Sequence, residues 1–198
     1  MIKDIKQIIE NLLHFYNFEN KTLLSVGAGG GQFIAYAKIA KHVIAVDNDK
    51  KALQILSKKI KEQNLENKFT LIHSDFMDIN IKSDVVFFEF CLHEMTNHQK
   101  MIDHAKSLSN DIIISDHNIE SEWAYIGNEI EKATLSWNII SKNPILKREQ
   151  YTITQIFKDY TELFNRVKEQ GDISINRIEK YRDKREIEIP MKYEFAQL

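Results

Sequence analysis

The chain has 198 residues, of which 43% are hydrophobic and 28% are charged. This length predicts one well-packed domain over residues 1–198 and excludes a cofactor domain joined to a full-sized substrate domain. The formal net charge is −2 and the lysines are scattered, so a nucleic acid is a disfavoured partner. The single cysteine excludes an internal disulfide, and a cytoplasmic location is expected.

Residues 1–18 predict an amphipathic N-terminal helix, because their apolar side chains recur at the 3.6-residue spacing of a helix. Acidic residues and lysines interrupt every apolar run that is long enough for a signal peptide or a membrane span. We therefore expect no membrane association.

Five short apolar runs follow, at residues 21–26, 42–47, 69–73, 84–89 and 111–115. Helical patterns lie between several of them, including residues 32–40 and 99–108. Each run is almost continuously hydrophobic, which is typical of strands that are buried on both faces of a parallel sheet. The pattern predicts a doubly wound α/β fold.

After the fifth run, residues 119–160 are predicted to form a helical insertion that carries Trp123, Tyr125 and Trp137. Open α/β proteins bind ligands at the carboxyl ends of their strands, so an insertion here is a candidate lid. Residues 186–195 alternate strictly between apolar and polar side chains, which predicts a half-exposed antiparallel strand. Pro190 within it favours a sheet edge or a bulge.

A glycine-rich turn lies where the first strand is followed by a helix. Gly27, Gly29 and Gly31 allow positive φ angles and let the backbone approach a ligand. A dinucleotide fingerprint would have its third glycine at position 32, which is Gln32 here. Asp47 ends the second strand, where a carboxylate accepts hydrogen bonds from a ribose. Nicotinamide and adenosylmethionine sites share that chemistry, so both remain open at this point.

Two further motifs follow in order. Asp75 and Phe76, after the third strand, offer a carboxylate and an aromatic ring to an adenine, and Glu89 ends the fourth strand. With these residues the chain resembles the class I S-adenosylmethionine-dependent methyltransferases over roughly its first 115 residues, since all four motifs occur at ordinary spacing. The alternating tail is compatible with the antiparallel final strand of that family.

The resemblance implies a mostly parallel seven-stranded sheet and S-adenosylmethionine as the cofactor. It implies that the methionine part of the cofactor lies against the glycine turn, with Tyr16 flanking the same end. For Tyr16 the alternative is a helix face packed on the sheet. The implied cofactor residues are Gly27, Ala28, Gly29, Gln32, Asp47, Asn48, Asp75, Phe76, Glu89 and Tyr16.

The exit of the fourth strand is dense in titratable side chains. Methyl transfer is an in-line displacement that needs a base when the acceptor is protonated, and His93 is the candidate, with Asp116 and His117 at the same rim. The alternative is that His93 and Glu94 cap the next helix and that Asp116 and His117 begin a hydrogen-bonded loop. No metal is expected.

Glu94, Trp123 and Tyr125 are candidates for binding the acceptor, although aromatic residues in helices more often belong to the core. Members of the family that methylate amino groups of nucleic acids often carry Pro-Pro and an aromatic residue after the fourth strand, and this chain does not. We therefore expect a small-molecule or peptide acceptor and consider a homodimer possible. The alternatives are an NAD(P)-dependent oxidoreductase and a non-catalytic adenosylmethionine-binding protein.

Overall fold

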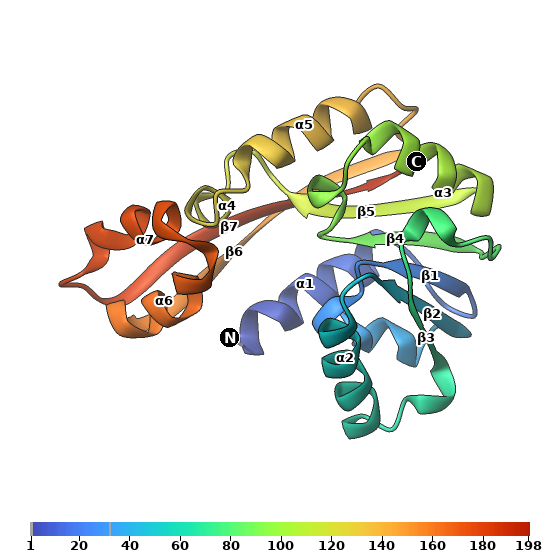
Figure 1. The fold of residues 1–198 in the computed structure, drawn as a ribbon, viewed down its shortest axis with the longest axis horizontal. Helices are drawn as coiled ribbons and strands as arrows, with labels where there is room; N and C mark the ends of the chain where they lie inside the picture. Colours follow the sequence, from blue (N-terminus) through green and yellow to red (C-terminus); the bar gives the residue numbers. More distant parts are fainter. Residues whose placement is uncertain (1, 32) are drawn as a thin grey trace.

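The computed structural model describes residues 2–31 and 33–198. Its centre is one mixed sheet with the strand order β3-β2-β1-β4-β5-β7-β6, in which the first five strands are parallel and β7 is antiparallel to both of its neighbours (Figure 1). The strands are β1 (Thr22–Val26), β2 (His42–Asp47), β3 (Phe69–His73), β4 (Val85–Glu89), β5 (Asp111–His117), β6 (Lys147–Asp159) and β7 (Arg185–Gln197). The predicted doubly wound α/β fold and the seven-stranded sheet are confirmed.

Helices cover both faces of the sheet. The α-helices are α1 (Ile2–Phe15), α2 (Lys50–Glu62), α3 (His98–Leu108), α4 (Glu122–Ile126), α5 (Ile130–Ile140), α6 (Tyr160–Val167) and α7 (Asp172–Ile178). Buried residues of α1 and α2 share one hydrophobic cluster with one face of the sheet, and those of α3 and α5 share a second cluster with the other face. In the described part of the chain, no helix has the length and apolarity that a membrane crossing requires.

The strand order reverses between β1 and β4, so the connections that leave these two strands run to opposite sides. Such a switch point opens a crevice outside the carboxyl ends of the strands. The order of the elements thus predicts the position of a ligand site before any side chain is considered.

The helix predicted over residues 32–40 is not an α-helix. The chain forms two short 3₁₀ turns instead, at Gly29–Gly31 and Ile34–Lys38. Gly30 and Gly31 have φ angles of 73° and 60°, which no α-helix contains, so no α-helix can begin within the glycine turn itself. Gln32 lies outside the described residues.

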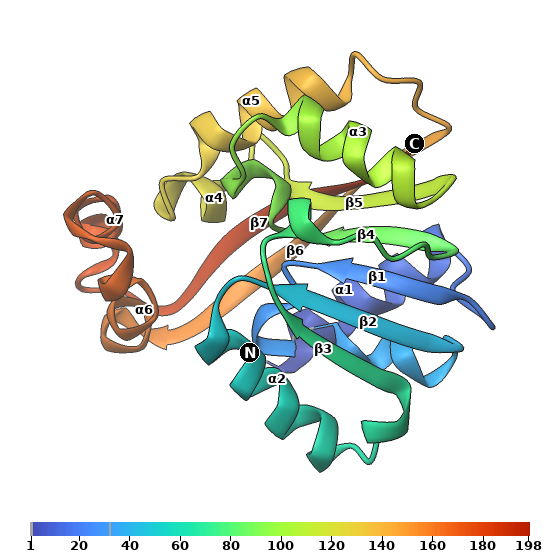
Figure 2. The same cartoon turned by 45° about the vertical axis from the view of Figure 1, so that its right-hand side comes forward.

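The predicted helical insertion is correct only in its first half. Residues 122–126 and 130–140 are helical, but residues 147–159 form the long strand β6. Tyr151, Ile153 and Phe157 alternate with more exposed neighbours and pack against the core, which is the period of a strand. A long β6–β7 hairpin results, with α6 and α7 at its far end (Figures 1 and 2).

The predicted antiparallel strand at residues 186–195 is confirmed as part of β7, and Pro190 occupies the position that its chemistry requires. It lies opposite Thr154 of β6, whereas β5 pairs only with Tyr193–Gln197. At Pro190, β7 is therefore a sheet edge on one side, where a missing N–H costs no ladder hydrogen bond.

Candidate functional site

A cleft of about 410 Å³ lies at the carboxyl ends of β1, β2, β3 and β4, at the switch point of the sheet. It collects residues from four separate segments of the sequence, all of which follow a parallel strand. The lining residues are Val26, Gly27, Val46, Asp47, Asn48, Ser74, Asp75, Phe76, Glu89, Phe90, Cys91, Glu94, Met95, Thr96 and Met101. Six of the predicted cofactor residues are thus brought together: Gly27, Asp47, Asn48, Asp75, Phe76 and Glu89.

The glycine turn is shaped by close contacts that exclude side chains. Gly27 has a φ of 67°, and a Cβ there would lie 2.6 Å from Sγ of Cys91. A Cβ on Gly29 would lie 2.7 Å from Oδ2 of Asp47. The turn therefore packs directly on Cys91, which follows β4, and on Asp47, the last residue of β2. Ala28 is buried beside it and is not among the cleft residues.

Asp47 and Asn48 form the end of β2. The Oδ1 atom of Asp47 accepts a hydrogen bond of 2.8 Å from the backbone N–H of Asp49, which fixes the orientation of the carboxylate. The backbone oxygen of Asn48 lies 3.0 Å from Nε2 of His73, at the end of the neighbouring strand. A carboxylate held in this way presents its second oxygen to the cleft wall made by the glycine turn.

Asp75 and Phe76 form the wall beyond β3. The carboxylate of Asp75 accepts a 2.8 Å hydrogen bond from the backbone N–H of Met77 and so begins a short 3₁₀ turn. Phe76 is 4% exposed and packs edge-on against Phe88, with 5.3 Å between the ring centroids. Its ring is thus a core side chain and, at the same time, part of the cleft lining.

Glu89 is a buried carboxylate at the end of β4. It accepts hydrogen bonds from the hydroxyls of Ser25 and Tyr36, which lie behind the cleft. Burial raises the pKa of Glu89 to about 7, although these two hydrogen bonds act in the opposite direction. A carboxyl group that titrates near neutrality at the centre of a cleft is a mark of a functional site.

Phe90, the next residue, has a φ of 51°, a strained value for a bulky side chain. Two contacts stabilise this strained conformation: a 2.9 Å hydrogen bond from the N–H of Phe90 to the carbonyl of Ser115, and stacking of the Phe90 ring on Phe33, with ring centroids 5.7 Å apart. This conformation turns the chain sharply and places Cys91 against Gly27.

His93 and Asp116, both predicted as catalytic, lie together. Nδ1 of His93 is 2.5 Å from Oδ1 of Asp116, and its backbone N–H donates to Oδ2 of the same residue at 3.2 Å. Burial lowers the pKa of His93, but the carboxylates of Asp116, Glu94 and Glu129 outweigh this effect, and the pKa is raised above its usual value. The buried carboxylate of Asp116 thus orients the imidazole of His93.

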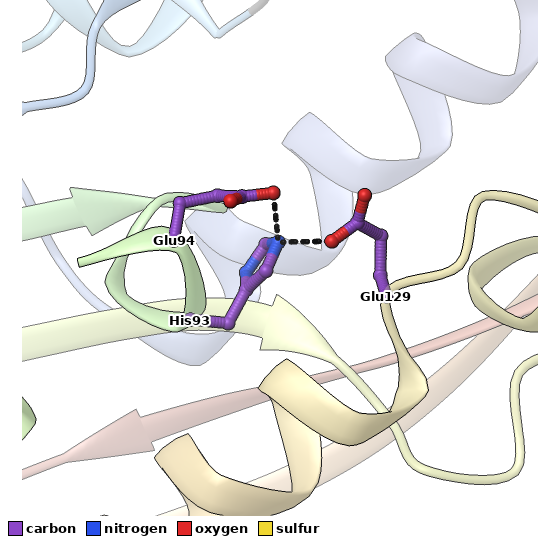
Figure 3. A group of neighbouring side chains, drawn as sticks. All are labelled: His93, Glu94 and Glu129. Atoms are coloured by element: carbon purple, nitrogen blue, oxygen red, sulfur yellow. Dashed lines mark ion pairs between the residues drawn. The ribbon is translucent and has the colours of Figure 1, made fainter. Parts of the chain in front are cut away.

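Glu94, Glu129 and Lys132 cover the other side of the His93 ring. Figure 3 shows the two glutamates pointing at the same ring nitrogen, and Nε2 is 3.6 Å from a carboxylate oxygen of each. The ammonium of Lys132, from α5, lies 2.8 Å from Glu94 and 3.0 Å from Glu129. Of the predicted acceptor residues, Glu94 is the one that lines the cleft.

His117 lies beside this pair, with 5.6 Å between its ring centroid and that of His93. Burial lowers the pKa of His117 to about 4, so its imidazole is neutral at physiological pH. Neither His117 nor His93 nor Asp116 is among the residues that line the cleft; they lie directly behind Glu94 and Phe90. Their predicted roles in catalysis stay predictions.

The prediction that Tyr16 contacts the cofactor is wrong. Its hydroxyl donates a 2.6 Å hydrogen bond to Asp111, which begins β5, whereas the cleft lies at the opposite ends of the strands. Its ring packs on Phe18 in the core. Tyr16 directly follows α1 and packs in the core, which is close to the alternative of a helix face packed on the sheet.

Trp123 and Tyr125 do not reach the cleft either. Trp123 is 8% exposed and stacks on Phe157 of β6, with 5.7 Å between the ring centroids. Tyr125 is half exposed on the far side of α4, where Arg177 lies over its ring at 4.1 Å. Both aromatic rings join α4 to the hairpin and its helices, so their assignment to the acceptor site is corrected.

Sequence reasoning missed two groups. Ser25 and Tyr36 hold Glu89, and a polar residue inside an otherwise apolar strand was the available signal for Ser25. Glu129 faces His93 from 36 positions further along the chain, at the start of α5, and no sequence pattern links the two. Met95, Thr96 and Met101 complete the cleft beyond Glu94.

Comparisons with known proteins agree on the first half of the chain. Residues 24–109 match the family model described as a methyltransferase domain. Over 83 residues the chain is 37% identical to a ribosomal RNA small subunit methyltransferase A from Mycoplasma mobile. That match covers 41% of this chain and 30% of the relative, so the chain spans less than a third of the length of this relative.

Solved structures share the fold along nearly the whole chain. The YcgJ protein from Bacillus subtilis is 14% identical and aligns with a TM-score of 0.66 over 100% of this chain and 97% of that one. Magnesium protoporphyrin IX methyltransferase from Synechocystis, solved with bound S-adenosylmethionine, is 16% identical, with a TM-score of 0.54 over 98% of this chain and 78% of that one.

Proposed function

We propose that this chain is a class I S-adenosylmethionine-dependent methyltransferase, because residues 24–109 match the methyltransferase domain model, and that it transfers the methyl group of S-adenosylmethionine to a small molecule or a peptide side chain. The observation that carries the proposal is the cleft itself. It joins the glycine turn, the carboxylate of Asp47 and the buried Glu89 at the carboxyl ends of neighbouring parallel strands.

In this proposal the adenosine lies across the ends of β2 and β3. The Asp47 carboxylate accepts hydrogen bonds from the ribose hydroxyls, and Asp75 and Phe76 flank the adenine. The methionine part lies along the turn at Gly27, which lines the cleft and packs on Cys91. Glu89, once ionised, places a negative charge near the sulfonium and the amino group of the cofactor.

The chemical step is an in-line displacement. A lone pair of the acceptor forms a bond to the methyl carbon while the carbon–sulfur bond breaks, and the sulfur keeps the electron pair as the neutral sulfide of S-adenosylhomocysteine. If the acceptor carries a proton, that proton passes to a base. The base predicted at His93 stays a prediction, because Glu94 would have to move before an acceptor could reach the buried ring.

A small acceptor is supported by the charge of the chain and of the cleft lining. The net charge is −2, and Glu94 contributes an acidic group to the cleft. A phosphate backbone is bound by clusters of basic residues, and the described residues that line the cleft include no lysine or arginine. The cytoplasmic location and the homodimer, which the sequence suggests, stay predictions.

A ribosomal RNA acceptor is the second candidate, and the name of the Mycoplasma mobile relative favours it. The matched segment covers 30% of that relative, so most of that protein has no counterpart in the match. Incubation of the purified protein with radiolabelled S-adenosylmethionine and a cell extract separates the two candidates. Label in small metabolites or peptides supports our proposal, and label retained in small-subunit ribosomal RNA supports the alternative.

Binding of the cofactor is tested by titration calorimetry with S-adenosylhomocysteine. We expect Asp47→Asn to weaken binding at least about tenfold, because one charge-assisted hydrogen bond contributes roughly 1.5 kcal/mol or more. Asp183→Asn, at an exposed position between the 3₁₀ turn Glu179–Tyr181 and β7, is the matched control and should bind like the wild type. A wild-type protein that binds neither S-adenosylmethionine nor S-adenosylhomocysteine would overturn the proposal.

A further inference from the structure

We infer that His93, Glu94 and Glu129 form a binding site for a divalent transition-metal ion at the rim of the cleft. Figure 3 shows the arrangement: one imidazole nitrogen and one oxygen of each glutamate face a common point. The three ligand atoms lie within 4.8 Å of one another. They come from the turn after β4 and from the start of α5, so only the tertiary fold brings them together.

The distances suit a tetrahedral ion. Nε2 of His93 is 3.6 Å from Oε1 of Glu94 and 3.6 Å from Oε2 of Glu129, which is beyond hydrogen-bonding distance. Zn²⁺ binds histidine nitrogen and glutamate oxygen at about 2.0–2.2 Å, which places tetrahedral ligand atoms roughly 3.3–3.5 Å apart. The two separations from Nε2 therefore need to shrink by only a few tenths of an ångström, and the glutamate oxygens lie within 4.8 Å of each other.

The histidine is prepared for this role by its own surroundings. Its side chain is 4% exposed, and the 2.5 Å contact between its Nδ1 and Asp116 leaves Nε2 directed at the two glutamates. Ligating histidines usually have a carboxylate beside their second nitrogen, which orients the ring and increases its basicity. Asp116 itself is fully buried, so the orientation is rigid.

The glutamates already attract a cation. The Lys132 ammonium donates hydrogen bonds of 2.9 and 2.8 Å to the two carboxylate oxygens of Glu94. It lies 3.0 Å from Oε2 of Glu129, yet this oxygen is buried and accepts no hydrogen bond within the described residues. Lys132 is nearly half exposed, so it can swing into solvent when a doubly charged ion takes its place.

Three protein ligands leave one tetrahedral position open, as in catalytic zinc sites. Because Glu94 also lines the cleft, that position is near the place where an acceptor would approach the cofactor. A metal on Nε2 takes the lone pair that a general base needs, so this inference replaces the base role predicted for His93. It also departs from the sequence-based expectation of no metal.

The test is titration calorimetry of the chelator-treated protein with ZnCl₂ and, separately, with MgCl₂. We expect one zinc ion per chain and much weaker binding of magnesium, which prefers an octahedral set of oxygen ligands. Glu129→Gln should lower the zinc affinity at least about tenfold, which is the size of effect seen even for residues behind metal ligands. Glu131→Gln is the matched control, since it removes the same charge from an exposed position of α5.

Lys132→Met gives an independent prediction of opposite sign. Removing the competing ammonium should raise the zinc affinity several-fold, whereas a site that does not involve Glu94 and Glu129 would show no increase. Circular dichroism and S-adenosylhomocysteine binding of each variant report folding and cofactor binding separately. Equal zinc binding by the wild type, Glu129→Gln and Glu131→Gln would identify adventitious metal and overturn the inference, as would a wild type without bound zinc.

Discussion

At the scale of single residues, the site is built from side chains whose properties depend on burial. Glu89 and His93 lie four positions apart, yet burial shifts the pKa of Glu89 upward to about 7, while three carboxylates counteract burial at His93. The glutamate is thus close to its titration midpoint at neutral pH, and the histidine is biased toward the charged form. Neither property follows from the residue type.

The buried Glu89 predicts a specific dependence of stability on pH. Its pKa is raised from 4.5 to about 7 in the folded chain, so the folded state binds the proton more tightly than the unfolded state. The resulting stabilisation is present below pH 4.5 and is lost as the pH rises through 7. Relative to Glu89→Gln, the wild type should lose roughly 2–3 kcal/mol of unfolding free energy between pH 5 and pH 8.

Urea unfolding of both proteins at each pH measures this difference. The glutamine keeps an oxygen that accepts the hydrogen bonds from Ser25 and Tyr36, so its fold is expected to persist. Glu131→Gln, at an exposed position, should follow the wild type. Parallel pH profiles of the wild type and Glu89→Gln would show that Glu89 stays ionised throughout.

At the scale of elements, the β6–β7 hairpin packs against α4, α6 and α7, away from the cleft. Buried residues of α4, α6 and α7 belong to the same hydrophobic cluster as those of β6 and β7. The stacking of Trp123 on Phe157 connects α4 to β6 across this cluster. We therefore assign Trp123 to stability, whereas the sequence pattern placed it at the acceptor.

Trp123→Ala tests that assignment. Removing a buried tryptophan should destabilise the protein by about 3–5 kcal/mol, because a cavity replaces the stack on Phe157. The dissociation constant of S-adenosylhomocysteine, measured at a temperature where the variant is folded, should change less than about twofold. Tyr125→Ala, on the exposed side of the same helix, should cost about 1 kcal/mol or less. Loss of cofactor binding at unchanged stability would contradict the assignment of Trp123 to stability.

At the scale of the whole molecule, cofactor binding is coupled to folding, because the cleft exists only when four strands are assembled. S-Adenosylhomocysteine at 100 times its dissociation constant should stabilise the protein by about 2.7 kcal/mol, which a thermal unfolding scan detects as a higher midpoint. NAD and NADP at the same concentration should leave the midpoint unchanged. Stabilisation by NAD or NADP alone would favour the oxidoreductase considered from the sequence.

The sequence by itself determined the α/β class, the five parallel strands, the final antiparallel strand and the glycine turn with Asp47, Asp75 and Glu89. These features are local, because hydrophobic runs, strict alternation and glycines act over a few neighbouring residues. Where two local signals competed, as at residues 29–38 and 147–159, the helix expectation failed.

Only the tertiary structure decided which distant side chains meet. It placed Tyr16 on Asp111 at the wrong end of the sheet for a cofactor contact, and Trp123 on Phe157 in the core. It also brought Glu129 to His93. Such pairs are determined by the packing of whole elements against one another. The spacing of residues along the chain does not reveal which elements pack together.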